Sequence, residues 1–487
     1  MAAAGWSFFI GLRKLLAAPP EGFGRFKDKS NQYKLNQKAI GMSNKYDRKD
    51  FLKISSAAMS GAMLTSAGLP KMSFAKKSGR DNPIRLGFVG IGGRGQWHLS
   101  SALGIPGVQV PAVCEIKPER LYTAKRWVEE AGQPTPTLYG EDEDKTAFER
   151  MCGEEDLDAV ICATSWKWHA PVCLAAMRND KHAACEVPLV LTLEEGWELI
   201  ETFESTGHWA STVLGGFPDV TLLNMIRQGL LGDMIHAEGG YIHDLRFVKH
   251  APDEEPWRLW HSIYRNGNLY PDHPMRTIMP ALDINHGDRI DYLISMGTKS
   301  VMLNDYAADQ YGEEHPYATK EMKQGDYNAS LIRTVDGKMI TLNFDTNTPH
   351  PRGNYRFQGT KGVYLRDRGT NRIYIDGQSP ESHEWEPAET YREEYESPIL
   401  KNYNPPERVV EIRGHGGSNR QTSINWTNLV EAIRNGTQPY IDTYDSVTSS
   451  AVSAVTEKSI AEGCRPVDFP DFTRGKWKNR APIFSDV

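Results

Sequence analysis

The chain has 487 residues and a mass of 54.7 kDa, enough for two or three domains with a sizeable hydrophobic core. Its 63 acidic residues outnumber its 56 Lys and Arg residues, so the formal net charge is −7, which excludes a uniformly basic surface for nucleic acid. Charged residues make up 24% of the chain and hydrophobic residues 39%, as is typical of a globular protein.

Residues 1–80 have the pattern of an export signal followed by a linker. Arg48 and Lys49 precede Phe51, and a weakly apolar run rich in Ser, Gly and Ala follows over residues 54–69. The pattern resembles a twin-arginine signal with Lys in the second position, and its apolar run is short and polar for a membrane span. We therefore expect an exported, periplasmic protein whose translation starts at Met42. The alternative is a cytoplasmic protein with a disordered tail.

A dinucleotide-binding motif starts with the first predicted strand, residues 84–89. The glycines Gly90, Gly92 and Gly95 follow it directly in a GxGxxG pattern, and a helix is predicted from Gln96. Gly90 allows the tight turn, Gly92 lets a pyrophosphate approach the backbone, and Gly95 allows close packing of helix on strand. The free N–H groups at the start of the helix complete an anion site. The pattern predicts a Rossmann domain over residues 81–212.

The second predicted strand, residues 108–114, ends at an acidic residue that favours NAD. Glu115 follows Gly95 by 20 residues, the spacing at which an acid accepts hydrogen bonds from the adenosine ribose hydroxyls. A carboxylate at this position also repels the 2′-phosphate of NADP. Lys117 and Arg120 lie nearby and moderate that preference.

Two further strand ends are expected to line the same crevice. A buried strand over 157–163 leads into Trp166, Lys167, Trp168 and His169, and a helix follows over 170–179. A short strand over 182–185 ends in Glu186, Val187 and Pro188, and the helix after it covers 192–206. Loops at the carboxyl ends of parallel strands border the ligand crevice, so Trp166 and His169 are expected beside the nicotinamide.

The six cysteines indicate neither a disulfide framework nor a metal site. They are spaced without a CxxC pair, and five of them, Cys114, Cys152, Cys162, Cys173 and Cys185, lie within one early stretch. We expect buried free thiols and no metal.

The order of elements resembles the Gfo/Idh/MocA oxidoreductase superfamily. That resemblance implies an α/β fold, in which a Rossmann parallel sheet precedes a substrate-binding α/β domain with an open, mainly antiparallel sheet. We expect this second domain over 213–470 and a tail over 471–487. Apolar and polar residues alternate over 339–344, which supports a strand, and helical patterns cover 422–435 and 443–462. Val187 stands where many members carry a proton-transferring Lys, so a simple alcohol dehydrogenase of that type lacks its usual acid and base here.

A set of short strings resembles glycoside hydrolase family 109, an NAD-dependent branch of that superfamily. They include Gly93-Arg94-Gly95-Gln96, Trp166-Lys167-Trp168-His169, Glu186-Val187, Gly239-Gly240-Tyr241, Trp257-Arg258, Leu269-Tyr270-Pro271 with His273, and Gly414-His415-Gly416-Gly417.

The family resemblance implies roles for the matching residues. Those expected to contact NAD are Gly93, Arg94, Glu115, Trp166, Lys167, Trp168, His169, Glu186 and Val187. Those expected to face the sugar are Tyr241, Arg258, Tyr270 and His273, because phenols and a guanidinium hydrogen-bond hydroxyls and stack on a pyranose. The Asn-Gly and Pro turns around Tyr270 and His273 indicate an exposed loop. For His243, His286 and His415 a structural role and a functional role remain equally open.

Part of the implied sugar pocket differs from the family pattern. Val213 and the run 215–218 stand where the family has Asn and Cys-Tyr-Arg-Arg, and Arg352 stands where it has a substrate-binding Tyr. The resemblance suggests an α-N-acetylgalactosaminidase-like enzyme, and these departures leave the sugar and its anomer open.

The family resemblance implies a glycosidase that uses NAD as a catalyst. In the implied cycle a hydride leaves C3 of the sugar for NAD, the resulting ketone acidifies the C2 proton, and a base removes that proton as the aglycone leaves C1. Water then adds and the hydride returns, an exception to the two-carboxylate scheme. An exported enzyme without a nicotinamide pool must retain its NAD. We expect His273, with Tyr270, to handle the proton steps.

Two alternatives remain open at this stage. One is a sugar oxidoreductase of the Gfo/Idh/MocA type with bound NAD(P), and the other is a catalytically altered sugar-binding protein. The expected partners are a small glycoside and NAD, with no nucleic acid and no membrane span. A homo-oligomer is compatible with a sheet that has an open face.

Overall fold

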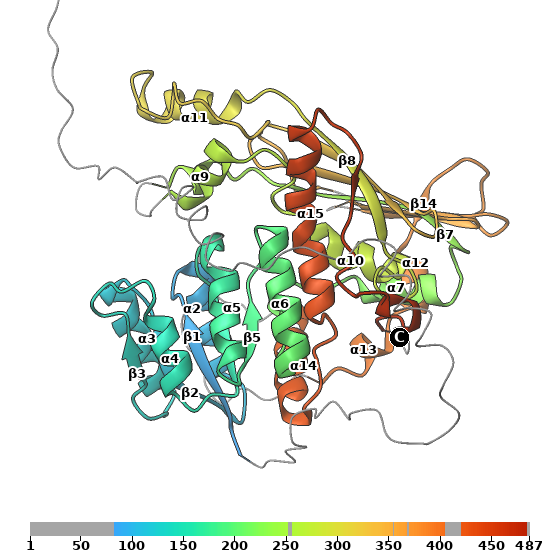
Figure 1. Ribbon diagram of the computed structural model, residues 1–487. Helices are drawn as coiled ribbons and strands as arrows, with labels where there is room; N and C mark the ends of the chain where they lie inside the picture. The colour runs from blue at the N-terminus through green and yellow to red at the C-terminus, as the bar shows by residue number, and fades with distance from the viewer. Residues whose placement is uncertain (1–81, 252–255, 354, 368–369, 405–419, 485–487) are drawn as a thin grey trace, which may run out of the picture. The chain divides into compact units, whose positions relative to one another are not determined.

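The computed structural model describes residues 82–251, 256–353, 355–367, 370–404 and 420–484 (Figure 1). The signal expected over residues 1–80, with Arg48, Lys49 and Met42, lies outside these ranges, and so does His415. Within the described ranges, no helix combines the length and the apolar character that crossing a bilayer requires.

Within the described ranges, six parallel strands form the first sheet in the order β3-β2-β1-β4-β5-β6. The strands are β1 (Ile84–Val89), β2 (Val108–Cys114), β3 (Thr137–Tyr139), β4 (Ala159–Cys162), β5 (His182–Cys185) and β6 (Ala210–Ser211). All four residues of β4 and of β5 are buried, because helices cover both faces of the sheet. This is the predicted Rossmann sheet.

The helices of this part are α2 (Gly93–Leu103), α3 (Pro118–Glu130), α4 (Ala147–Glu154), α5 (His169–Arg178) and α6 (Leu193–Thr206). The prediction that α2 begins at Gln96 was wrong, since the helix already starts at Gly93. Gly95 allows this early start, because a Cβ there would lie 1.9 Å from the carbonyl oxygen of Gly90. Gly90 itself has a φ of +86°, which favours glycine.

Within the same ranges, nine strands form the second sheet in the order β14-β13-β12-β11-β7-β10-β9-β8-β15. They are β7 (Met234–Ile242), β8 (Ile290–Gly297), β9 (Asn328–Thr334), β10 (Met339–Asp345), β11 (Tyr355–Gly359), β12 (Gly362–Arg366), β13 (Asn371–Ile375), β14 (Glu386–Pro387) and β15 (Val467–Asp468). Only the β7–β10 pair among these described strands is parallel, which confirms a mainly antiparallel sheet. Every second residue of β9 is buried, so one face of the sheet meets the core.

The helices of the second part are α7 (Val220–Arg227), α8 (Arg246–Lys249), α9 (Trp257–Tyr264), α10 (Asp272–Leu282), α11 (Met302–Tyr311), α12 (Glu389–Glu394), α13 (Pro398–Lys401), α14 (Arg420–Asn435) and α15 (Thr443–Ala461). Helix α10 packs against β7, and α15 packs against both α6 and β8, so α15 joins the two sheets (Figure 1). The helices predicted over 422–435 and 443–462 correspond to α14 and α15.

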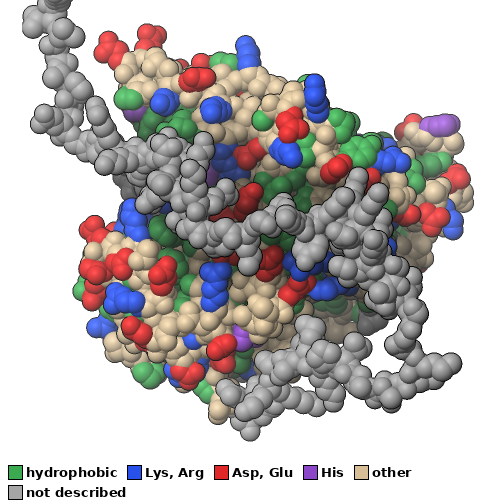
Figure 2. Space-filling view, in the orientation of Figure 1, with side chains coloured by type: hydrophobic (Ala, Val, Ile, Leu, Met, Phe, Trp, Pro, Cys, Tyr) green, Lys and Arg blue, Asp and Glu red, His purple; other side chains and the backbone are tan. Residues whose placement is uncertain are grey.

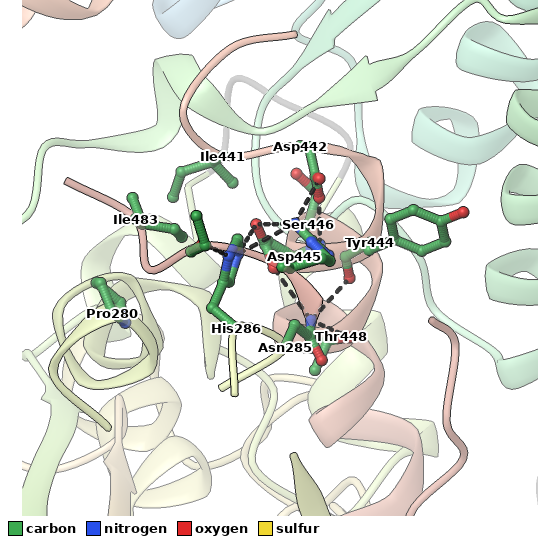
Figure 3. A network of polar contacts seen from close by, with 12 residues as sticks. Pro280, Asn285, His286, Ile441, Asp442, Tyr444, Asp445, Ser446, Thr448 and Ile483 are labelled. Atoms are coloured by element: carbon green, nitrogen blue, oxygen red, sulfur yellow. Dashed lines mark hydrogen bonds and ion pairs between the residues drawn. The ribbon is translucent and has the colours of Figure 1, made fainter. Parts of the chain in front are cut away.

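The segment after residue 471 packs back onto α15 through a buried polar network (Figure 3). His286 Nε2 lies 3.1 Å from Asp445 Oδ2, and Asn285 Nδ2 donates to Asp445 Oδ1 at 3.1 Å. Arg480 pairs with both Asp442 and Asp445. His286 thus has a structural role in the described fold.

Candidate active site

A cavity of about 230 Å³ lies at the carboxyl ends of β1, β2, β4 and β5. It is bordered by every residue expected to bind the cofactor except Gly95, namely Gly90, Gly92, Gly93, Arg94, Glu115, Trp166, Lys167, Trp168, His169, Glu186 and Val187. Gly95 instead packs under the loop against Gly90, as the motif predicts. We call this the cofactor cavity.

The start of α2 fits the pyrophosphate of a dinucleotide. Gly92 precedes the helix without a side-chain cap, and the first turn carries no acidic residue. A Cβ on Gly93 would meet nothing within 4 Å, so the space over the helix N-terminus is open. Uncapped backbone N–H groups and the positive end of the helix dipole suit an anion at this point.

Glu115 borders the cofactor cavity directly after β2. Its carboxylate accepts hydrogen bonds from the backbone N–H of Ile91 at 2.6 Å and of Lys117 at 2.9 Å, and the residue is 7% exposed. It is therefore not a solvated surface acid. Each carboxylate oxygen has a second lone pair, which leaves acceptor capacity for ribose hydroxyls.

Glu186 lies where the cofactor cavity opens into a second cavity. Its Oε1 accepts from Arg94 Nε at 2.7 Å and lies 2.8 Å from His98 Nε2. Burial opposes ionisation of Glu186, but the hydrogen bond from His98 and the charge of Arg94 outweigh it and lower the pKa of this carboxyl. Val187 follows with an apolar side chain, so the position after Glu186 supplies no proton.

The second cavity has a volume of about 840 Å³ and is bordered by Tyr241, Arg258, Tyr270 and His273, the four residues expected to face the sugar. We call it the sugar cavity. Five residues border both cavities: Arg94, Trp166, Glu186, Val187 and Arg258. A ligand in the sugar cavity therefore meets the end of the cofactor cavity expected to hold the nicotinamide.

Three aromatic rings form one wall of the sugar cavity. The ring of Tyr241, near the end of β7, stacks on Tyr270 with centroids 4.6 Å apart and on His273 with centroids 4.5 Å apart. The hydroxyl of Tyr241 also lies 3.2 Å from His243 Nδ1. His243 therefore contacts this wall through Tyr241.

The prediction that Tyr270 and His273 lie in an exposed loop was wrong. Tyr270 is 8% exposed and its ring packs against those of Trp166 and Phe344. His273 stands in the first turn of α10, after Pro271 at the N-cap position. The turn residues therefore precede a buried helix start, where Pro is favourable because its fixed φ suits the first turn.

The environment of His273 keeps its imidazole neutral. Burial, together with the charges of Arg276 and Arg352, lowers the pKa of His273 to about 3, although Glu186 opposes them. Burial also raises the pKa of Tyr241 and of Tyr270. At neutral pH this wall thus combines a proton acceptor with two phenol donors.

A serine of α15 connects the two sides of the site. Ser450 Oγ accepts from the backbone N–H of Leu189 at 2.8 Å and donates to Asp272 Oδ1 at 2.6 Å. Leu189 lies two residues after Val187, and Asp272 directly precedes His273. One hydroxyl therefore links the loop at the cofactor cavity to the helix that carries the imidazole.

Several residues of the sugar cavity were not predicted from the sequence. Arg276 borders it from α10, and Asn425 and Trp426 border it from α14. Arg276 follows His273 by three residues, which places both on one helix face and is a signal that the sequence does carry. The residues of α14 lie about 150 positions beyond α10 and carry no such local signal.

The cysteines are free as predicted: Cys114, Cys152, Cys162, Cys173 and Cys185 are buried and Cys464 is half-buried. Among the described residues, the donor atoms of Cys162, His169 and Cys185 lie within 4.8 Å of one another. However, His169 Nδ1 lies 2.7 Å from the carbonyl oxygen of Pro188 and Nε2 lies 3.1 Å from that of Thr164. Both ring nitrogens therefore face hydrogen-bond acceptors and neither is directed at a metal.

Residues 84–213 match the family described as "Oxidoreductase family, NAD-binding Rossmann fold". The fold is similar to a levoglucosan dehydrogenase in complex with NADH and levoglucosan, with a TM-score of 0.59, 18% identity, and coverage of 80% of this chain and 100% of that one. An inositol dehydrogenase homolog complexed with NAD+ from Azotobacter vinelandii gives a TM-score of 0.56 at 18% identity, covering 82% and 100%. The fold and the site thus define an NAD-binding protein with the oxidoreductase Rossmann architecture.

Residues 218–479 match the family described as "Glycosyl hydrolase 109, C-terminal domain". A glycosyl hydrolase family 109 protein from Solibacter usitatus (strain Ellin6076) is 36% identical over 446 residues, covering 90% of this chain and all of that relative. An alpha-N-acetylgalactosaminidase of Tannerella forsythia is 35% identical over 476 residues, covering 90% and 99%. The chain belongs to glycosyl hydrolase family 109, the class of NAD-dependent glycosidases that the sequence pattern indicated.

Proposed function

We propose that this protein hydrolyses glycosides with tightly bound NAD, through oxidation, elimination, hydration and reduction of the sugar. The observation that carries the proposal is that the cofactor cavity and the sugar cavity meet at Arg94, Trp166, Glu186, Val187 and Arg258. A sugar stacked near Tyr241 would then present its ring carbons to the nicotinamide. NAD, when bound, supplies the hydride acceptor for the first step and the hydride donor for the last.

The chain's own residues supply binding and proton transfer in this proposal. Arg258, Tyr241 and Tyr270 hydrogen-bond the sugar hydroxyls. His273 accepts a proton, either from the C3 hydroxyl as the hydride leaves C3 or from C2 of the resulting ketone. The C1–O bond then breaks, and the aglycone leaves with a proton on its oxygen. Water then adds its hydroxyl group to C1 and a proton to C2. A hydride on C3 and a proton on its oxygen restore the C3 hydroxyl. The sum of these steps is hydrolysis, with the cofactor unchanged.

N-acetylgalactosamine is one option for the sugar, because the Tannerella forsythia relative carries that activity in its name. The departures at Val213, 215–218 and Arg352 fall on this part of the site, and Gly215, Gly216, Phe217 and Arg352 border the sugar cavity. The identity of the sugar therefore does not follow from the family alone.

The proposal is tested with aryl glycosides of both anomers, supplied without added NAD and hydrolysed in D₂O. We expect turnover and deuterium at C2 of the released sugar, because that proton leaves and returns. A two-carboxylate hydrolase leaves C2 untouched, so a fully protiated product would contradict the elimination step. Stoichiometric reduction of an added sugar acceptor would instead favour the oxidoreductase alternative. Tight binding without turnover would favour the sugar-binding protein.

Export through a twin-arginine-like signal is part of the same proposal. It is supported by the Arg48-Lys49 pair and by a cofactor cycle that needs no external nicotinamide. Cell fractionation with mass spectrometry of the mature N-terminus tests it. Recovery of the protein in the cytoplasm with residues 1–80 intact would contradict it.

A further inference from the structure

The sugar cavity is strongly cationic in a protein with a net charge of −7. Among the described residues that border it, Glu186 and Asp367 are acidic, whereas five are basic: Arg94, Arg258, Arg276, Arg352 and Arg366. On the face drawn in Figure 2, by contrast, acidic and basic side chains are interspersed. The positive charge is thus concentrated where the substrate enters.

Three of these guanidinium groups lack a carboxylate partner in the part of the chain that the structure describes. Arg94 pairs with Glu186, and Arg366 pairs with Asp219. Arg258, Arg276 and Arg352 form no ion pair with any residue of the described ranges.

Arg276 is the most deeply placed of the three, at 6% exposure. Its Nη1 donates to the carbonyl of Gly216 at 3.2 Å and its Nη2 to that of Thr212 at 2.9 Å, while its Nε has no hydrogen-bond partner among the described residues. Carbonyl groups satisfy N–H donors but do not neutralise the charge. Burial of an unpaired charge is costly, so an anion bound in the cavity would offset that cost.

The loop before α7 leaves room for this guanidinium. A Cβ on Gly215 would lie 2.8 Å from Arg276 Nη2, and one on Gly216 would lie 3.5 Å from its Nε. The two glycines thus leave the space that the Arg276 side chain occupies.

We infer that the glycoside substrate carries an oxyanion, a carboxylate or a sulfate group, which binds between Arg276 and Arg352 beside His273. The inference rests on the proposed glycosidase function and names its substrate class. Planar guanidinium groups match both oxyanions through paired N–H donors, and an anion there would also sit in the positive field of Arg258.

The test compares matched 4-nitrophenyl glycosides of one hexose: the neutral hexoside, its 6-carboxylate and its 6-sulfate. We expect kcat/KM for at least one anionic member to exceed that of the neutral member by about tenfold or more, as a charge-assisted hydrogen bond allows. The two anionic members distinguish a uronide from a sulfated sugar. Raising the salt concentration should reduce the difference in kcat/KM between the anionic and the neutral glycosides.

The variants Arg352→Tyr and Arg276→Gln should each lower the ratio of anionic to neutral kcat/KM by about 10- to 100-fold. Arg126→Gln, an exposed residue of α3, is the matched control and should leave the ratio unchanged. Melting temperatures show whether each variant is folded. If Arg276→Gln is not folded, the test rests on Arg352→Tyr, which replaces an exposed residue.

A wild-type enzyme that hydrolyses neutral glycosides with C2 exchange and disfavours both anionic members would overturn the oxyanion site while the proposed function stands. Equal losses of kcat/KM on neutral and anionic substrates in both arginine variants would also overturn the oxyanion site and leave the proposed function standing. If no glycoside turns over, the proposed function fails. Calorimetric binding of free glucuronate, galacturonate and galactose 6-sulfate then decides the inference, and weaker binding of all three than of the neutral hexoses would refute it.

Discussion

The imidazole of His273 lies almost parallel to the phenol ring of Tyr241, with centroids 4.5 Å apart and an interplanar angle of 17°. This contact buries one face of the imidazole and fixes its direction in the sugar cavity. Burial, more than any neighbouring charge, lowers the pKa of His273. Stacking on Tyr241 thus orients the ring, and burial keeps it a neutral base.

His273→Ala should reduce glycoside turnover by about 10²–10⁴-fold, the usual contribution of a positioned acid or base. Bound NAD should be retained, because His273 does not border the cofactor cavity. Single-turnover kinetics and chromatography of the released nicotinamide measure the two effects. The exposed His383, replaced by Asn because its φ is +69°, is the control. Full activity of His273→Ala would transfer the role to another group, with His243 as the next candidate.

The acidic limb of the pH profile should lie well below the ordinary histidine value. Because the pKa of His273 is lowered to about 3, kcat/KM should stay level as the pH falls from 7 to 5. Arg276→Gln removes a positive charge that lowers this pKa, so the limb should move to higher pH. Glu186→Gln removes a negative charge that raises it, so the limb should move to lower pH. If the acidic limb moved in the same direction in both variants, a group other than His273 would control it.

Purified wild-type protein should contain NAD without supplementation, and Glu115→Ala should lose it. The carboxylate of Glu115 also accepts the N–H groups of Ile91 and Lys117, so its removal leaves two donors without an acceptor. We expect a loss of about 1–3 kcal/mol in the free energy of unfolding, measured with urea. Glu198→Gln, which breaks a half-exposed pair with Arg178, should change neither property. Retention of stoichiometric NAD by Glu115→Ala would contradict its role in binding ribose.

Gly215→Ala should displace the Arg276 guanidinium, because the new Cβ would lie 2.8 Å from both Arg276 Nη2 and Val187 Cγ1. The guanidinium is the end of a flexible side chain and gives way more readily than the backbone. We expect a loss of about tenfold in preference for anionic over neutral glycosides. Gly207→Ala is unsuitable as a control, because the φ of +76° at Gly207 would strain an alanine. Gly93→Ala is also unsuitable, because Gly93 borders the cofactor cavity. Gly153→Ala in α4, with only Asn179 Oδ1 nearby at 3.7 Å, is a suitable one.

The cofactor half of the site was predictable because its signals are local. The strand bounds 84–89, 108–114 and 182–185 agree with the structure, since apolar runs and glycine turns mark them within a few residues. The start of α2 was missed because two glycines weaken the helix pattern. Only the close approach of Gly95 to Gly90 shows why the helix tolerates them.

The prediction of the residues that border the sugar cavity depended more on the family resemblance than on local sequence patterns. Tyr241, Arg258, Tyr270 and His273 do converge on one cavity, although turn residues suggested an exposed loop for two of them. Arg276 was overlooked despite its i, i+3 relation to His273. The link from Ser450 to Leu189 spans 261 positions, and a contact of that separation leaves no trace in local periodicity.

The hydroxyl of Ser450 has a consequence for how such an enzyme diversifies. It holds the loop after Val187 and the start of α10 at once, so the spacing between these two elements depends on the protein interior rather than on residues that border the sugar cavity. The cavity wall around Arg352 can then be exchanged for side chains of other chemistry without altering that spacing.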